Sequence, residues 1–161
     1  MTVRVGPDDF DVTAEMARVS AQDTGIGGVA IFVGKVRDHA GGATLESMTL
    51  EHYPGMTEAE LERIEAEARQ RFRLSASLVI HRVGTLKPGD NIVLVIACAT
   101  HRQDAFAAAE FLMDYLKTRA PFWKKEVLTS GEARWVEAHD ADEAAAAAWQ
   151  AKPDEPRRRA P

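Results

Sequence analysis

One stretch constrains the fold of this chain more than any other. Residues 91–100 (N-I-V-L-V-I-A-C-A-T) are almost entirely apolar, which predicts a strand at the centre of a sheet. The next residues, Thr100-His101-Arg102-Gln103, follow the pattern of a capping box and predict a helix that starts directly after this strand. The expected apolar stripe of that helix consists of Ala105, Phe106, Ala109, Leu112, Met113 and Leu116.

The remaining patterns predict a mixed order of elements. Strands are expected at residues 3–5, 29–37, 45–53, 76–83, 122–128 and 134–138, and further helices at residues 12–21, 57–72 and 140–149. Residues 29–37 are apolar enough to be buried on both faces, and Gly34 within them predicts a bulge or a close backbone approach. Across the Gly41-Gly42 turn they are expected to form a hairpin with residues 45–53. Without regular strand–helix alternation, the chain is expected to have an α+β fold with a largely antiparallel sheet.

Length and composition predict a single soluble domain. The 161 residues suit one domain at residues 1–150, followed by a polar, proline-rich tail at residues 151–161 that we expect to be disordered. A net charge of −5 argues against a nucleic-acid partner. No apolar run is long enough for a membrane span, and no signal-peptide core is present. The single cysteine, Cys98, cannot form an internal disulfide and is expected to be buried and inert. These features favour the cytoplasm.

The candidate chemistry gathers between His101 and Glu126. Residues 101–125 contain five Lys or Arg and three Asp or Glu, a local excess of positive charge that suggests an anionic ligand. A helix N-terminus binds anions, and His101 and Arg102 would add donors to it. Lys117 and Lys124 flank Pro121, which limits the helix and lets the two lysines converge if the chain turns back. Paired lysines can act as general acid, base or nucleophile, although a lysine at a helix C-terminus more often only offsets the dipole.

Other polar residues carry weaker signals. His81-Arg82 repeats the His-Arg pair, but no helix follows it, so we rank it below His101-Arg102. Arg37, taken alone, is an ordinary charge at the end of a strand. No Cys, His and Glu cluster has the spacing of a metal site, and no G-x-S-x-G motif is present. The sequence therefore gives no indication of a metal or of a nucleophilic thiol.

Five blocks of the sequence resemble one known family. They are F-V-G-K-V-R (32–37), L-E-H-Y-P-G-M-T (50–57), H-R-V-G-T-L-K-P-G-D (81–90), A-T-H-R (99–102) and M-D-Y-L-K-T-R-A-P-F-W-K-K-E (113–126). In this order they are similar to the large, catalytic subunit of molybdopterin synthase, from about Gly28 to Trp149. The resemblance implies an α/β hammerhead-type fold with a small additional β subdomain. It also implies a homodimer within a heterotetramer, in which each large subunit binds a small ubiquitin-like sulfur-carrier subunit.

The resemblance also implies an activity and a set of site residues. The C-terminal Gly-Gly thiocarboxylate of the carrier would supply sulfur to cyclic pyranopterin monophosphate and form the dithiolene of molybdopterin, with no further cofactor. The matching catalytic positions are Lys117 and Lys124, and the two ends of the helix would form halves of one pocket. A basic residue past the matching tryptophan, Trp135, reaches the neighbouring subunit in this family, and here His139 or Arg134 would take its place. The alternative is a non-catalytic dimeric module that binds an anionic phosphate ligand. The matching substrate-binding positions are Arg37, His101, Arg102 and His139.

Overall fold

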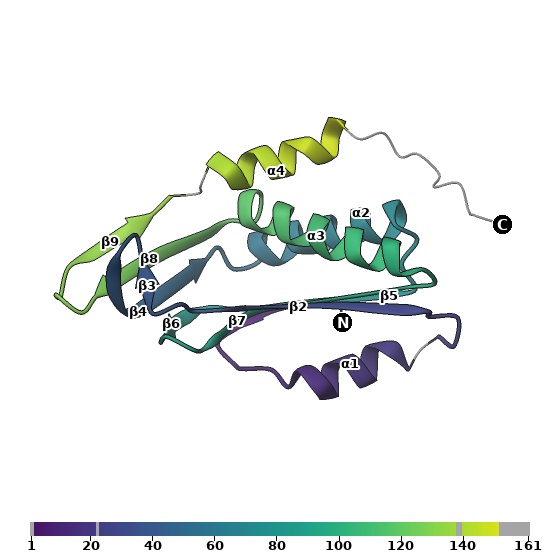
Figure 1. The fold of residues 1–161 in the computed structure, drawn as a ribbon, viewed down its shortest axis with the longest axis horizontal. Coiled ribbons are helices and arrows are strands. Elements are labelled where there is room, and N and C mark those ends of the chain that lie inside the picture. The colour runs from purple at the N-terminus through teal and green to yellow at the C-terminus, as the bar shows by residue number, and fades with distance from the viewer. Residues whose placement is uncertain (1, 22, 138–139, 152–161) are drawn as a thin grey trace.

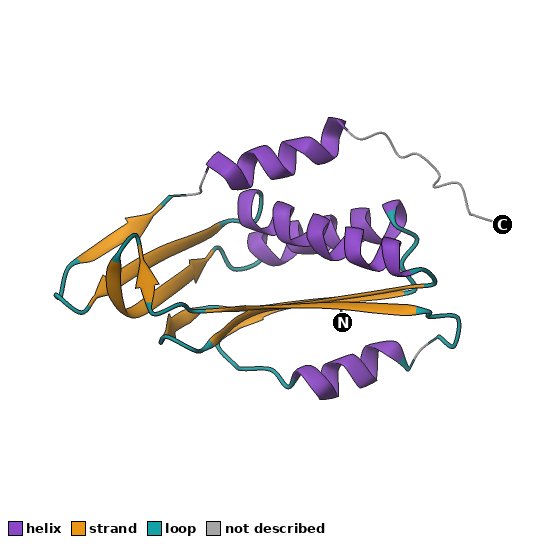
Figure 2. Cartoon of the chain, viewed as in Figure 1, coloured by secondary structure: helices purple, strands orange, loops and turns teal. Residues whose placement is uncertain are grey.

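The fold is known from a computed structural model, which describes residues 2–21, 23–137 and 140–151. Within them lie two sheets and four helices (Figures 1 and 2). The first sheet has the strand order β1-β5-β7-β2, in which β1 and β5 are parallel and the other pairs are antiparallel. Its strands are β1 (Val3–Gly6), β2 (Gly28–Lys35), β5 (Ala76–Arg82) and β7 (Asn91–Ala99).

Helices cover both faces of this first sheet. Figure 1 shows α1 on one face and α2, α3 and α4 on the other. On the α2 and α3 face, the core contains Leu61, Phe111 and Tyr115, and on the α1 face it contains Val19 and Leu78. Burial on both faces explains the unbroken apolar run of β7, whose residues Leu94–Cys98 are fully buried. The helices are α1 (Val12–Ser20), α2 (Met56–Arg71), α3 (Arg102–Thr118) and α4 (Asp140–Ala151).

The second sheet is the additional β subdomain. It has the order β3-β4-β8-β9, with β6 paired to β4, and lies beyond one end of the first sheet (Figure 2). All its described strand pairs are antiparallel. The predicted α+β class, with a largely antiparallel sheet and an additional β subdomain, is confirmed. The strands are β3 (His39–Ala40), β4 (Ala43–His52), β6 (Gly84–Leu86), β8 (Phe122–Leu128) and β9 (Ala133–Val136).

The predicted hairpin between residues 29–37 and 45–53 is wrong. Strand β2 pairs with β7, whereas β4 pairs with β3, β6 and β8 in the other sheet. The register shifts between Gly34 and Lys35, after which Val36 bonds to the backbone of Asp90 and the chain leaves the first sheet. The Gly41-Gly42 turn, with φ of +58° and +82°, joins the short strand β3 to β4 instead. A bulge at Gly34 therefore redirects the chain before the turn.

Strand β2 is also more exposed than its sequence predicts. It is the edge strand of the first sheet, and Val29, Ile31 and Phe32 are 37%, 38% and 43% exposed. Phe106, placed in the buried stripe of α3 by the sequence, is 67% exposed. Exposed apolar side chains therefore lie on an edge strand, an arrangement that usually marks a contact surface.

Neither helix cap follows the sequence pattern. Thr57-Glu58-Ala59-Glu60 also has the pattern of a capping box, but the N-cap of α2 is Gly55, two residues earlier, and the Glu58 carboxylate accepts a hydrogen bond from the backbone N–H of Gly55 at 2.7 Å. The Thr57 hydroxyl is buried and donates to the carbonyl of Pro121 at 3.0 Å. At α3 the cap residue is His101, whose side chain makes no capping hydrogen bond. Thr57 thus tethers α2 to the segment between α3 and β8.

Residues 152–161 of the predicted disordered tail lie outside the described part of the chain, and Ala151 is the last residue of α4. The helix is attached to the domain by Trp149, whose ring packs against Phe72 and Phe111 at centroid distances of 5.7 and 5.5 Å. Its indole N–H also donates to the Asp114 carboxylate at 2.7 Å.

Candidate functional site

A cavity of about 440 Å³ lies where the two sheets meet, and we call it the junction cavity. Its wall comes from elements far apart in the sequence: the end of β2 and the segment after it, β4, β5, β7, the C-terminal turns of α3, β8 and the start of α4. Lys117 of α3, Lys124 of β8 and Arg37 after β2 all line it. Together with Lys35, these three basic residues share one space of the size that usually holds a small ligand.

The turn at Pro121 explains how both lysines reach this cavity. Helix α3 ends at Thr118, and β8 begins at Phe122. Successive side chains of a strand alternate between its faces, so Lys124 and Glu126 share one face of β8. Both line the junction cavity, whereas the neighbouring Lys125 does not. The chain therefore turns back after the helix and brings Lys124 to the same space as Lys117, as the position of Pro121 predicts.

The cavity also contains a buried acid that the sequence analysis missed. Glu126 is 7% exposed and lies 3.6 Å from Nε of Arg134 on β9. The same guanidinium donates to the carbonyl of Ala40 at 3.0 Å, which ties β9 to β3. The strand alternation that places Lys124 in the cavity could have identified Glu126, two residues later.

One carboxylate also approaches Lys117, but only loosely. Its Nζ lies 4.0 Å from an oxygen of Asp142, in the first turn of α4, and its side chain is 54% exposed. An ion pair of this length and exposure contributes little to stability. The Lys117 ammonium therefore remains available to an anionic ligand that enters the cavity.

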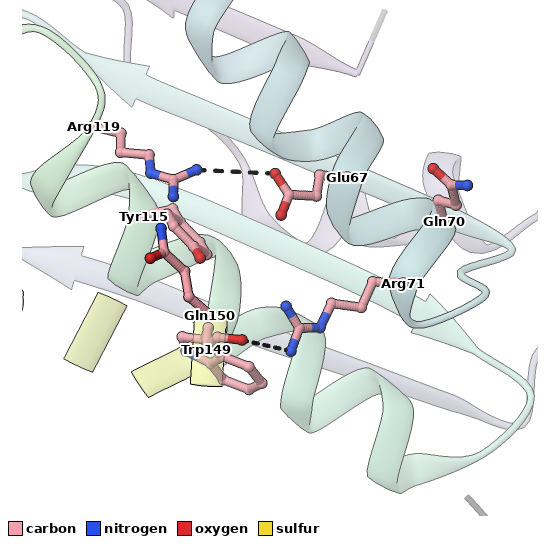
Figure 3. A pocket seen from close by; sticks show the side chains of 7 residues that line it. All are labelled: Glu67, Gln70, Arg71, Tyr115, Arg119, Trp149 and Gln150. Atoms are coloured by element: carbon pink, nitrogen blue, oxygen red, sulfur yellow. Dashed lines mark hydrogen bonds and ion pairs between the residues drawn. The ribbon is translucent and has the colours of Figure 1, made fainter. Parts of the chain in front are cut away.

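A second hollow, of about 420 Å³, lies between α2, α3 and α4 (Figure 3). The Arg119 guanidinium lies 3.9 Å from the ring centroid of Tyr115 and 4.0 Å from the Glu67 carboxylate. Arg71 donates to the backbone carbonyl of Trp149 at 2.9 Å and lies 5.4 Å from its ring centroid. Both arginines are engaged in holding the helices together, so this hollow has a structural role.

Two classes of site receive no support from the described residues. Among them, no group of three or more His, Cys, Asp and Glu side chains is arranged to hold a metal ion. Within the same residues, no helix combines the length and the apolar character needed to cross a membrane. Cys98 is fully buried, and burial raises the pKa of its thiol. This cysteine is therefore unsuited to nucleophilic chemistry.

A comparison with known protein families identifies the family of this chain. The family described as "MoaE protein" matches residues 5–119. The chain belongs to the MoaE family. This result confirms the resemblance noted from the sequence blocks, and it makes the chain a member of an enzyme family.

Individual relatives agree with this assignment. The molybdopterin synthase catalytic subunit of Mesorhizobium japonicum is 54% identical over 150 residues, which cover 92% of this chain and 93% of the relative. The MoaE protein of Burkholderia ambifaria has a solved structure with a TM-score of 0.79 and 52% identity, covering 92% of this chain and 97% of that one. A complex of subunits 1 and 2 of the molybdopterin-converting factor of Helicobacter pylori matches with a TM-score of 0.65 and 18% identity, covering 86% and 90%, which shows a shared fold.

The residues that the MoaE resemblance implied do not all meet in one chain. Arg37, Lys117 and Lys124 line the junction cavity, but His101 and Arg102 do not. His101 and Arg102 are exposed at the other end of α3. Because a helix rises by about 1.5 Å per residue, His101 and Lys117 lie about 24 Å apart along it. The expectation that the two ends of this helix form one pocket is therefore wrong within a single chain.

The structure describes only one of the two residues that were expected to reach the neighbouring subunit. His139 lies outside the described residues. Arg134 contacts Glu126 and Ala40 of its own chain. Its guanidinium is thus engaged beside the junction cavity of its own subunit.

The structure also places His81 in the cavity wall, although the sequence ranked it low. Its pKa is lowered to about 4, mainly by burial and to a smaller extent by His52, against the hydrogen bond to the Arg82 carbonyl, which raises it. Sequence patterns do not predict this position, because the ring contact between His81 and Phe122 joins residues far apart in the chain.

Proposed function

We propose that this member of the MoaE family transfers sulfur from the C-terminal thiocarboxylate of a small ubiquitin-like carrier subunit to cyclic pyranopterin monophosphate. The product would be the dithiolene of molybdopterin. The observation that carries the proposal is the meeting of Arg37, Lys117 and Lys124, from three separate segments, in one cavity of about 440 Å³. Both proposed reactants are anionic, one through its thiocarboxylate and the other through its cyclic phosphate. A cavity with several cations suits them.

The two lysines have complementary proposed roles. One ammonium group polarises the thiocarboxylate carbonyl or protonates the oxygen that leaves the pterin, and the other holds the negative charge that develops. Arg37 offers a planar fork of donors to the cyclic phosphate. The sulfur must come from the carrier, because Cys98, the only cysteine of the chain, is fully buried. Lys117 and Lys124 therefore act on a sulfur atom that the chain itself does not supply.

The homodimer that we propose explains the positions of His101 and Arg102. They lie beside the Gly28 end of β2: a Cβ atom on Gly28 would lie 3.2 Å from the Cα of Arg102. Arg37 follows the other end of the same strand. If the exposed edge of β2 pairs in antiparallel fashion with β2 of a second copy, the Gly28 end of each copy meets the Lys35 end of the other. His101 and Arg102 of one subunit would then complete the substrate site of its neighbour.

The length of β2 fits this arrangement. Its eight residues span roughly 26 Å at about 3.3 Å per residue, close to the helical separation of His101 and Lys117. The exposed apolar side chains Val29, Ile31 and Phe32 lie along the edge that would be covered. The substitution Ile31→Glu, which places a charge in the middle of this edge, should therefore convert the dimer to a monomer. Light scattering would measure the change in mass. An unchanged dimer would rule out this interface.

A small partner subunit is supported by the Helicobacter pylori relative, which is a complex of two subunits of molybdopterin-converting factor. We propose that the C-terminus of such a carrier enters the junction cavity. Together with the dimer, this would give a heterotetramer of two large and two small subunits.

The deciding experiment combines the protein, a thiocarboxylated carrier and cyclic pyranopterin monophosphate, and follows the dithiolene product by mass. Lys117→Ala and Lys124→Ala should each lower the rate by roughly 100-fold or more, because each removes a charge that acts on the reacting groups. The matched control is Lys125→Ala: it removes a lysine from the same strand, but one that does not line the cavity. Wild-type rates in both cavity variants would reject the assignment.

The rival function, a non-catalytic dimeric module for a phosphate ligand, explains the cavity charge equally well. It predicts that the wild-type protein binds the cyclic pterin but forms no product with the thiocarboxylated carrier. The relative from Mesorhizobium japonicum is named a catalytic subunit, which favours the enzyme.

A further inference from the structure

His81 is the one buried histidine in the wall of the junction cavity among the residues that the structure describes. It lies near the end of β5 and is 5% exposed. Its imidazole stacks on the ring of Phe122, with a centroid distance of 3.9 Å and an angle of 21° between the planes. Phe122 begins β8, the strand that carries Lys124. The stack therefore fixes the orientation of the imidazole relative to the strand that holds a proposed catalytic residue.

The hydrogen bond of the ring defines which nitrogen carries the proton. Nδ1 lies 2.8 Å from the carbonyl oxygen of Arg82. A carbonyl can only accept, so Nδ1 must be the donor, and the lone pair of the neutral ring is on Nε2. With a pKa lowered to about 4, mainly by burial, the ring is neutral at physiological pH.

We infer that the Nε2 atom opens to the cavity. Within the described residues, no fully buried side-chain nitrogen or oxygen lacks a hydrogen-bond partner. Nε2 has no partner among those residues, so it must touch open space, and the space that His81 lines is the junction cavity. The lone pair is thus available to a ligand.

Charged groups face the same space from the surrounding elements. The cationic groups are Lys35 and Arg37 at and after the end of β2, Lys117 on α3 and Lys124 on β8. The acids are Glu126, which pairs with Arg134, and Glu137 and Asp142. The other histidine of the wall, His39, is exposed and bonds to Asp38. His81 therefore adds a neutral, buried acceptor to a cavity whose other strong groups are charged.

We propose that His81 is a positioning residue for the substrate: its Nε2 accepts a hydrogen bond from an N–H group of the pterin ring. This inference rests on the proposed function. The cyclic phosphate is drawn to the cations, whereas a reduced pterin presents ring and amino N–H donors that need an acceptor. A neutral acceptor at a fixed angle sets how the heterocycle lies in the cavity. It also disfavours phosphate ligands that have no N–H to offer.

The test measures the affinity of the full-length protein for two probes, cyclic pyranopterin monophosphate and inorganic phosphate, by calorimetry. His81→Phe keeps an aromatic ring to stack on Phe122 but removes the acceptor. It should weaken pterin binding about tenfold, the effect of losing one hydrogen bond and leaving a donor unpaired. The affinity for inorganic phosphate should not change, because phosphate engages only the cations.

A second variant separates acceptor loss from altered packing. In His81→Gln the side-chain carbonyl can accept a hydrogen bond near the former position of Nε2, so this variant should bind the pterin more tightly than His81→Phe. The inference is overturned if His81→Phe binds the pterin like the wild type, if its phosphate affinity falls in parallel, or if the Gln variant binds no better than the Phe variant. Failure of the proposed function is distinguishable, because the wild-type protein itself would then form no dithiolene product.

Discussion

Two inactive variants should restore each other's activity when they share a dimer. If each site combines Lys117 of one subunit with Arg102 of the other, Lys117→Ala and Arg102→Ala should both be inactive alone. A heterodimer of the two has one site with both defects and one site with neither. The roughly 24 Å between the two ends of α3 is too long for a side chain to bridge within one subunit, which is why we propose shared sites.

The expected recovery follows from the symmetry. After equal amounts of the two variants are unfolded together and refolded, about half of the dimers are mixed, and each mixed dimer has one intact site in two. The mixture should regain about a quarter of the wild-type rate. The assay is dithiolene formation with an excess of thiocarboxylated carrier and cyclic pterin, with each variant refolded alone as the baseline.

A matched control places both substitutions in the same chain. When the double variant is refolded with an equal amount of wild-type protein, both sites of a mixed dimer are defective, so only about a quarter of all sites remain active. If each site were contained in one subunit, about half would remain active, and the two single variants would show no recovery on mixing. Either of those results would refute shared sites at the edge of β2.

Three further predictions concern individual positions. Gly34→Ala should lower the free energy of unfolding by about 1–3 kcal/mol in urea titrations, because its Cβ would lie 2.6 Å from Cγ1 of Val93, whereas Gly6→Ala meets nothing within 4 Å and should be nearly neutral. His81 has a folded-state pKa of about 4, below its unfolded value of 6.5, so between these pH values the unfolded state binds more protons than the folded state. Acidification from pH 7 to 4 should therefore destabilise the wild type by about 3 kcal/mol more than it destabilises His81→Phe. An equal loss in the two proteins would contradict the burial of a neutral imidazole. Cys98→Ala should retain sulfur transfer at near the wild-type rate, since its thiol is fully buried, and loss of activity in a folded variant would show that the chain's own sulfur takes part.

The sequence by itself determined the elements whose signal is local. The apolar run of β7 identified a central strand because both faces of that strand are covered by helices. Leu61, Ile64 and Ala68 recur in the sequence at helical spacing, and they form the buried face of α2. The turn at Pro121 and the strand after it were also predictable, and with them the approach of Lys124 to the end of α3. These properties depend on residues that are neighbours along the chain.

Only the tertiary structure decided which strands pair and which side chains share a space. Strand β2 pairs with β7 rather than with β4, because a bulge at Gly34 sends the chain into the second sheet before the glycine turn. His81 and Glu126 reach the junction cavity through packing between elements, so no local spacing pointed to the histidine. The separation of His101 from Lys117 follows from the straight length of α3, which converts sixteen residues of sequence into about 24 Å of distance. Proximity in a folded chain is set by such long-range packing, whereas periodicity reports only how each segment meets its immediate surroundings.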